Sequence, residues 1–278
     1  MGMEDYHAHK LDKANLKEGP ISCSMLKAFE ANPYAWLRAP ERQPTAAMQT
    51  GSLLDLALTE PETLQDRVAV SPYDSYRTKE AREWRDTTLA SGILIADEVE
   101  IENAKACAAA VRNHKVAGKI MDGAKCQVGV VGEIAGIPAK CLIDILPGAG
   151  EYEETLFDYK TTSGGLDDEA ISKAIGNFKY HWQAAFYSTL FNKVAPDRVA
   201  SEFGFIFQDP QTREVRVVML HEDALALGSR MVGEALKEFV TCAERGIKSR
   251  YRSRVSTINV PAYVGMQEED KLIAKQDQ

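Results

Sequence analysis

The segment Leu142–Thr162 reads LIDILPGAGEYEETLFDYKTT and contains two short apolar runs, Leu142–Leu146 and Thr155–Thr162. A turn rich in proline, glycine and acidic residues separates them. Apolar runs of this length, bounded by residues that break regular structure, are typical of paired β-strands. The segment therefore predicts a β-hairpin, and the rest of the chain is best interpreted around it.

Each run carries one carboxylate that packing does not require, Asp144 in the first and Asp158 in the second, and the second adds Lys160. An ionised carboxylate on an apolar strand is costly unless it is paired or binds a metal. Side chains alternate along a strand, so Asp158 and Lys160 point to the same face. If Asp144 lies opposite them, the three groups form a site for a hard divalent cation with oxygen ligands. The alternative is a solvated Asp–Lys ion pair at the edge of the hairpin.

The composition is that of an ordinary globular protein. The 278 residues are 45% apolar and 27% charged, and the formal net charge is −8, which argues against a basic nucleic-acid coat protein. A nuclease remains compatible with this charge, because positive groups can be confined to a channel. The sequence has no apolar run of membrane-spanning length and no signal-peptide pattern at its start. The five cysteines are scattered without a CxxC motif, which favours a reducing cytoplasm and no zinc or iron–sulfur site.

The first half of the chain has helical patterns. Residues 1–20 are polar, and we expect a flexible arm. Ser22 or Ser24 is a suitable N-cap for a first helix, and Asn32-Pro33 interrupts it. A second helix is expected over 45–60, where Asp55 is a lone charge among apolar neighbours. A surface position on an amphipathic helix and a metal or hydrogen-bond partner are both open interpretations of Asp55. The pattern over 93–117 predicts one long packing helix.

From residue 127 the hydrophobic period changes to that of strands. A tight turn at Ala135-Gly136 is expected to join two strands, and with the strand that carries Asp158 they form a three-stranded meander. Two helices, two more strands and a long amphipathic helix follow. The expected elements are strands 128–134, 137–144 and 155–161, helices 167–175 and 180–194, strands 202–207 and 214–220, and a helix over 225–247. This order predicts an α/β core with a mixed sheet and a helical N-terminal part.

Several motifs occur in an order that resembles a known family. They are Ile21-Ser22-Cys23-Ser24-Met25-Leu26-Lys27, Gly51-Ser52-Leu53-Leu54-Asp55, Ala139-Lys140-Cys141-Leu142-Ile143-Asp144, Phe157-Asp158-Tyr159-Lys160-Thr161-Thr162 and Tyr180-His181-Trp182-Gln183-Ala184-Ala185-Phe186-Tyr187. Together they resemble the exodeoxyribonuclease VIII (RecE-like) type of phage recombination nuclease, within the PD-(D/E)xK superfamily. The resemblance covers nearly the whole chain. It implies an α/β restriction-endonuclease-like core, a mixed central sheet flanked by helices.

The resemblance also implies roles for individual residues. Asp144, Asp158 and the backbone carbonyl of Tyr159 would hold Mg²⁺ or Mn²⁺. Lys160 would position or help to deprotonate the attacking water. Gln183 and Tyr187 are four residues apart, so they share a helix face that would look onto the active site and the DNA.

One position departs from the family pattern. The family usually has a histidine metal ligand where this chain has Asp55. An aspartate supplies oxygen to the same hard cation and adds negative charge, so Asp55 is a candidate metal ligand. It equally fits weakened or altered metal use.

Two basic clusters are candidates for DNA contact, and each is also explained as a solvated helix face or helix end. The first comprises Arg77 and Lys79. The second comprises Lys248, Arg250, Arg252 and Arg254. Phosphate contacts by such groups would make DNA binding dependent on salt.

The domain organisation follows from these assignments. We expect an arm over 1–20, a single nuclease domain over 21–260 and a polar tail over 261–278. Within the domain, 21–120 would be helical and 125–250 would form the catalytic core.

The resemblance implies the activity and its setting. The chain would be a metal-dependent exonuclease acting from the ends of linear duplex DNA, 5′ to 3′, in phage-type recombination. It would form a ring-like homo-oligomer in the cytoplasm of a bacterial host, with a single-strand annealing recombinase as partner and no membrane. The alternatives are a catalytically weakened scaffold of the same fold, which Asp55 favours, and an unrelated metal-dependent hydrolase.

Overall fold

The computed structural model describes residues 6, 9–40, 44–249, 255–263 and 266. It divides the chain into a compact unit, Met1–Ile247, and a separate segment, Lys248–Gln278. In the part of the chain that the structure describes, no helix is long and apolar enough to cross a membrane.

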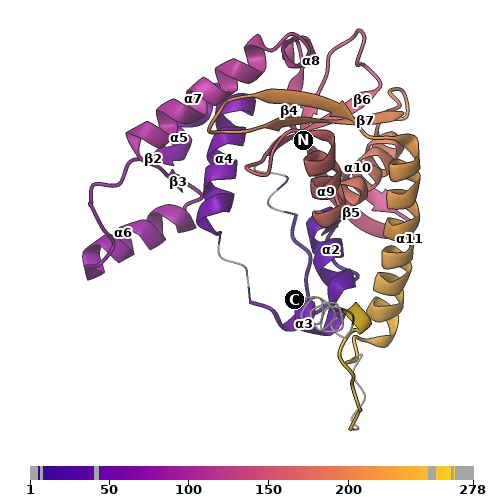
Figure 1. The fold of residues 1–278 in the computed structure, drawn as a ribbon. Helices are drawn as coiled ribbons and strands as arrows, with labels where there is room; N and C mark the ends of the chain where they lie inside the picture. The colour runs from indigo at the N-terminus through magenta and orange to yellow at the C-terminus, as the bar shows by residue number, and fades with distance from the viewer. Residues whose placement is uncertain (1–5, 7–8, 41–43, 250–254, 264–265, 267–278) are drawn as a thin grey trace, which may run out of the picture. The chain divides into compact units, whose positions relative to one another are not determined.

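A mixed sheet forms the centre of the compact unit (Figure 1). Among the described residues its strands follow the order β1-β5-β6-β7-β8, and β4 pairs with β5. The strands are β1 (Ile21–Ser22), β4 (Lys125–Ile134), β5 (Ile137–Leu146), β6 (Thr155–Thr161), β7 (Glu202–Gln208) and β8 (Val215–Met219). The predicted meander β4-β5-β6 is antiparallel throughout, whereas β6 pairs with β7 in parallel. The α/β class and the mixed sheet are confirmed.

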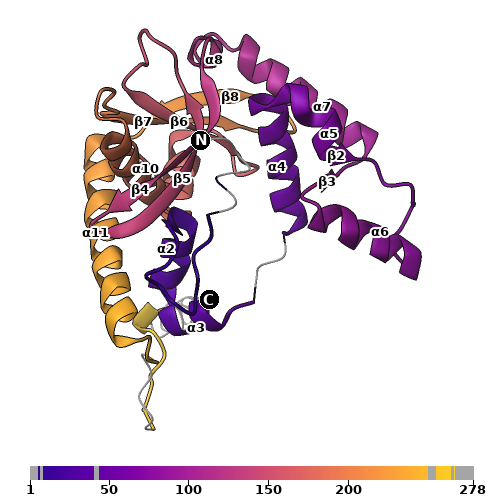
Figure 2. The ribbon, with the colours of Figure 1, turned by 180° about the vertical axis from the view of Figure 1, so that it is seen from behind.

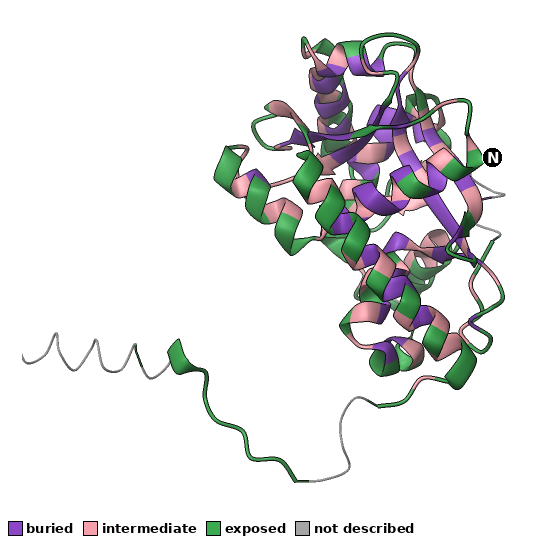
Figure 3. Cartoon of the chain, turned by 90° about the vertical axis from the view of Figure 1, so that its right-hand side faces the viewer, coloured by how far each residue is buried: buried purple, intermediate pink, exposed green. Residues whose placement is uncertain are grey.

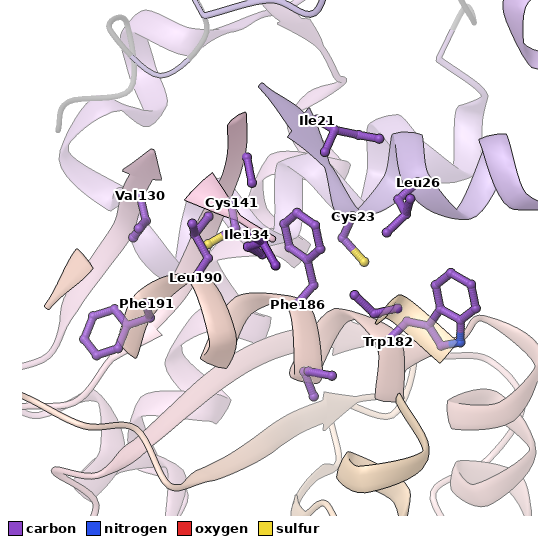
Figure 4. Packing of buried hydrophobic residues seen from close by; sticks show 14 of the residues in the cluster. Ile21, Cys23, Leu26, Val130, Ile134, Cys141, Trp182, Phe186, Leu190 and Phe191 are labelled. Atoms are coloured by element: carbon purple, nitrogen blue, oxygen red, sulfur yellow. The ribbon is translucent and has the colours of Figure 1, made fainter. Parts of the chain in front are cut away.

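Helices cover both faces of this sheet, as the two opposite views show (Figures 1 and 2). On one face, α2 (Cys23–Ala31), α10 (Tyr180–Val194) and α11 (Glu222–Arg245) pack against the strands, with α3 (Pro33–Arg38) and α9 (Asp168–Asn177) beside them. Figure 4 shows Phe186 and Leu190 of α10 near Ile134 and Cys141 of the sheet, and Trp182 of the same helix on the side of Cys23 and Leu26. On the other face lie α4 (Ala46–Thr59), α7 (Glu98–Asn113) and α8 (Ala117–Met121).

The first helices begin and end where the sequence predicts. Ser22 caps α2 by accepting a hydrogen bond from the Met25 backbone N–H at 3.3 Å. Asn32 ends α2 and caps α3, with Pro33 at the first position of α3, where a missing N–H costs nothing. Thr45 caps α4, which ends at Thr59 before Pro61.

The prediction of one long helix over 93–117 is wrong. The region holds a short strand β3 (Leu94–Ile95), which pairs with β2 (Val68–Ala69), and then α7 and α8. The reason is a capping box, in which Asp97 and Glu100 satisfy each other's backbone N–H groups and fix the start of α7. Val99, counted in the expected apolar stripe, is 78% exposed.

Two connecting helices lie near this strand pair. They are α5 (Leu64–Arg67), after the 3₁₀ turn η1 (Pro61–Thr63), and α6 (Lys79–Ala90), which links β2 to β3. Of the residues of α6, only Ala81 is buried. Figure 3 shows that the buried residues gather in the strands and on the inner faces of the helices, while exposed residues form the outer faces. The predicted helix over 225–247 is present with shifted ends, as α11.

The described part of the N-terminal segment, for which we expected a flexible arm, packs against the compact unit. Leu16 is buried, and Lys13 Nζ donates to the Trp36 carbonyl at 3.0 Å. Lys140, itself buried on β5, donates through Nζ to the carbonyls of Tyr6, at 3.0 Å, and His9. A buried ammonium requires such acceptors, so β5 holds the segment in place.

Candidate active site

Strand β6 presents the centre of the site. Asp158 and Lys160 lie on the same face, as their spacing predicts, and Asp158 Oδ2 forms an ion pair with Lys160 Nζ. Gln183 of α10 donates through Nε2 to the other carboxylate oxygen of Asp158. Asp158 is 1% exposed, so these two contacts compensate a carboxylate that is almost fully removed from water.

Asp144 reaches the same place from β5. The single Cα pairing between β5 and β6 is Ile145 with Phe157, and the antiparallel register puts Asp144 opposite Asp158. Asp144 Oδ2 accepts a hydrogen bond from the Tyr159 backbone N–H at 3.1 Å. The carboxylate thus takes a backbone donor of β6 at the point where the pairing of β5 and β6 ends. The predicted convergence of Asp144, Asp158 and Lys160 is present.

Asp55 approaches from α4, on the other face of the sheet. Asp55 Oδ2 accepts a hydrogen bond from Gln127 Nε2 at 2.9 Å, and the same Nε2 donates to Thr59 Oγ1 at 3.2 Å. Asp55 Oδ1 is buried and has no hydrogen-bond partner among the described residues. A cavity of about 220 Å³ adjoins this carboxylate and is lined also by Glu60, Arg67 and Leu142. Asp55 is therefore an interior acid with one oxygen unsatisfied.

The pKa directions show that these charges act on one another. Burial, and then the charge of Asp158, raise the pKa of Asp55 to about 7. Burial and the charges of Asp158 and Asp55 raise the pKa of Asp144 well above its ordinary value. Burial alone would lower the pKa of Lys160, but Asp158 and Asp144 raise it above its ordinary value, so the ammonium keeps its proton. Ionisation of all three carboxyls at once is therefore disfavoured, because one lysine does not offset three negative charges.

The sequence did not indicate Gln127, which the structure adds to this site. Gln127 is 7% exposed and lies on β4, opposite Asp144 in the register of β4 and β5. Its backbone φ is +50°, a left-handed conformation that costs a side-chain-bearing residue free energy and is concentrated at functional sites. No local pattern in the sequence marks this position, because its contact to Asp55 joins residues 72 apart.

The other residues predicted from the helix α10 also lie near the site. Tyr187 is partly buried, and burial followed by the charges of Cys141, Asp158 and Asp144 raises its pKa well above the ordinary value. Tyr180 places its ring 5.0 Å from Lys160 Nζ, a cation–π contact that the sequence did not predict.

Lys27 of α2 is a second basic group at this end of the sheet. Burial lowers its pKa, and the charges of Lys160 and Asp158 act on it as well. Its Nζ donates to the Phe178 carbonyl at 3.0 Å. Lys27 ends the first of the sequence motifs, but nothing in that motif predicts a role for it.

Two of the predicted DNA-contacting residues, Arg77 and Lys79, belong to the compact unit but not to this cluster. Arg77 and Lys79 are exposed at the start of α6, and Lys79 pairs with Glu83 at 3.5 Å. Lys248 belongs to the separate segment. Arg250, Arg252 and Arg254 lie outside the described residues.

The donor set fits a hard divalent cation in its chemistry. Asp55, Asp144 and Asp158 supply only oxygen, and the buried Asp55 Oδ1 lacks a partner among the described residues. Over the same part of the chain, no three His, Cys, Asp or Glu side chains already stand close enough together to hold a metal ion. On β6, both carboxylate oxygens of Asp158 already interact with other side chains, one with Lys160 and one with Gln183. The oxygens are therefore of the right kind, but they are not gathered as a preformed cage.

A mixed sheet between helices, with Asp144, Asp158 and Lys160 where two strands separate, defines a PD-(D/E)xK-type α/β protein. The comparisons agree. Residues 22–257 match the family described as "PDDEXK-like domain of unknown function (DUF3799)", and the chain belongs to that family, within the PD-(D/E)xK superfamily.

One solved structure supports the fold independently. It is a protein from Eubacterium rectale, described as a "Putative exonuclease", whose crystal structure was determined at 2.19 Å. The two chains are 16% identical and superpose with a TM-score of 0.62, over 95% of this chain and 97% of the other. At this identity the likeness concerns the fold alone. No curated protein matches the sequence.

Proposed function

We propose that this protein is a metal-dependent exodeoxyribonuclease that hydrolyses phosphodiester bonds from the ends of linear duplex DNA, 5′ to 3′. The observation that carries the proposal is the convergence of Asp144, Asp158 and Lys160 at the separation of β5 and β6, where the charge of Asp158 also acts on Asp55. Membership of a PDDEXK-like family and the fold shared with a protein described as an exonuclease support it.

Mg²⁺ or Mn²⁺ would be held by Asp144, Asp158 and the Tyr159 carbonyl, with Asp55 as an additional ligand. When bound, such an ion polarises the scissile phosphate and lowers the pKa of a bound water. Lys160 keeps its proton in this environment, so its ammonium would orient the attacking water and offset the charge that develops on the phosphate. Gln183 would fix the rotamer of Asp158 through its amide hydrogen bond.

The setting of the reaction forms the second part of the proposal. We infer a ring-like homo-oligomer that encloses DNA and works with a single-strand annealing recombinase in phage-type recombination. Its support is the resemblance of motifs such as Ile21–Lys27 and Asp158–Lys160 to the exodeoxyribonuclease VIII type. Mass photometry of the purified protein, alone and with linear DNA, tests it, and a monomer under both conditions contradicts the ring.

The activity is tested on linear duplex DNA labelled at one end, with Mg²⁺, with Mn²⁺ and with EDTA, and closed circular duplex serves as the end-free control. We expect Lys160→Ala to abolish a metal-dependent loss of linear DNA. Lys105→Ala is the matched control, because Lys105 also pairs with an acid, Glu102, but lies on the exposed surface of α7. Which labelled end is lost first gives the polarity.

Three outcomes contradict different parts of this proposal. Retained DNA binding without cleavage in either metal would favour the weakened scaffold, and Asp55 would then be the suspected cause. Cleavage that survives Lys160→Ala would place the chemistry at another site. Degradation of the closed circle would retain a nuclease but exclude dependence on ends.

A further inference from the structure

Phe178 is an exposed aromatic residue that the mechanism above does not use. It is the C-cap of α9, two residues before the start of α10, and it is 63% exposed. A single exposed apolar side chain is common on protein surfaces. Phe178 differs from such a residue in how its backbone is held and in what lies behind its ring.

The turn that presents Phe178 is fixed from two sides. Lys27 Nζ donates to its carbonyl oxygen at 3.0 Å, which ties the turn to α2. The next residue, Lys179, has a φ of +52° and pairs with Glu30 of α2 at 2.7 Å. A left-handed non-glycine residue persists only where its surroundings impose it. The Phe178 ring therefore projects from a rigid, preorganised turn.

Behind Phe178 lies a direct connection to the catalytic lysine. The rings of Phe178 and Tyr180 are stacked, with centroids 5.5 Å apart and planes inclined by 26°. The Tyr180 ring in turn lies 5.0 Å from Lys160 Nζ. A planar group placed on the free face of Phe178 would thus continue a stack that ends at Lys160.

Phe178 also lines a cleft that is large enough to hold part of a polymer chain. Its volume is about 940 Å³, and it runs between α4, the end of β6, α9 and the turn after β7. Thr161 and Thr162, which directly follow Lys160, form part of its wall, together with Asn177 and Gln211. Among the described residues that line the cleft, none is Asp or Glu and one, Lys173, is a cation, which pairs with Glu169 of α9. In a chain of net charge −8, a cleft free of acids suits a polyanion.

We infer that Phe178 is a stacking platform for one base of a nucleic-acid strand that lies in this cleft. The inference rests on the proposed nuclease function and adds to it a contact to a base, made through an aromatic face. Such stacking is tolerant of sequence, because every base has a π-face. The ligand is therefore a single strand or an unpaired end of any sequence, and the paired interior of a duplex does not fit, because its bases already stack on one another.

The test measures binding of a fluorescent dT oligonucleotide to the full chain in EDTA by anisotropy. One abasic tetrahydrofuran residue is moved along the strand. For the native chain we expect one position at which the abasic residue weakens binding about tenfold, the change that the loss of one stacked base produces. Phe178→Trp should keep this profile. Phe178→Leu should bind the intact strand about tenfold more weakly and show no sensitive position.

Two controls accompany these variants. Val99→Ala removes an apolar side chain of high exposure, 78%, from α7 and should bind as the native chain does. Thermal unfolding of each variant checks the fold, and because the Phe178 ring is exposed we expect the midpoints to agree.

The outcomes separate this inference from the proposed function. A native chain that cleaves DNA but shows no sensitive position, or a Phe178→Leu variant that keeps one, overturns the stacking platform and leaves the nuclease standing. A native chain that neither binds nor cleaves DNA overturns both.

Discussion

At the scale of single residues, Gln127 is the residue of the candidate site that the structure reveals and the sequence does not indicate. It is buried, adopts a left-handed backbone, and donates to both Asp55 and Thr59. The hydrogen bond to Asp55 Oδ2 fixes that carboxylate and leaves Oδ1 directed elsewhere, without a partner among the described residues. We interpret Gln127 as a positioning residue, which acts on the reaction through Asp55.

Two substitutions separate this role from a merely structural one. Gln127→Ala removes the amide and keeps the strained backbone, whereas Gln127→Gly removes the amide and relieves the strain, a difference of about 1 kcal/mol in the free energy of unfolding. We expect both variants to lose metal-dependent cleavage about tenfold, while urea unfolding finds the glycine variant the more stable. If activity instead follows stability, so that Gln127→Gly recovers it, the positioning role is wrong.

The contrast between Gln127 and its neighbours shows what sequence can predict at this scale. Asp144, Asp158 and Lys160 stand out because a charge on an apolar strand needs a reason, and their spacing alone puts two of them on one face. Gln127 is an ordinary polar residue in a strand. Neither its left-handed φ nor its hydrogen bond to a distant residue can be recognised from the neighbouring sequence. Asp55 stands out in the sequence too, but the orphaned oxygen that gives it interest is visible only in three dimensions.

At the scale of elements, the packing of α10 against α11 depends on a glycine. A Cβ built on Gly228 would lie 2.1 Å from the His181 carbonyl oxygen and 3.2 Å from the Ala185 Cβ of α10. Gly233, further along α11, would meet nothing within 4 Å. The two positions share a helix and differ only in what faces them.

This pair gives a matched prediction of opposite sign. Gly228→Ala should lower the free energy of unfolding by about 2 kcal/mol, because the methyl group forces the backbones of the two helices apart. Gly233→Ala should raise it by about 0.5–1 kcal/mol through helix propensity alone. Urea unfolding of the two variants measures both. Equal effects would show that the helices do not approach each other as closely as the structure has them.

Element boundaries were predictable where the chemistry is local. The caps Ser22 and Asn32 and the turn at Ala135-Gly136 act within a few residues, and their elements appear as expected. The prediction of one helix over 93–117 was wrong because it relied on the apolar periodicity. It gave too little weight to Gly92, which breaks regular structure, and to Asp97, which caps a new helix. The parallel pairing of β6 with β7 was not predictable from either strand alone, because it depends on the crossover through α9 and α10 that joins them.

At the scale of the whole molecule, the proposed function requires an acidic chain to hold DNA. The basic run that begins at Lys248 lies outside the compact unit Met1–Ile247, so its removal should leave the folded core intact. We therefore consider a full-length variant with four basic residues of the run replaced by glutamine. The changes are Lys248→Gln, Arg250→Gln, Arg252→Gln and Arg254→Gln.

If these side chains neutralise phosphates, the slope of log K against log salt for linear duplex should fall by about 0.9 for each phosphate that is no longer neutralised. The thermal midpoint should not change. A control must carry the same net charge, because any removal of cations weakens attraction to DNA at long range. It replaces four exposed lysines of the compact unit, Lys105, Lys119, Lys193 and Lys237. Only direct binding of phosphates by the run makes the slope of the first variant fall further than that of the control. Equal slopes would show that the run does not bind phosphates directly. The cleft next to Lys160 would then be the remaining candidate for binding DNA.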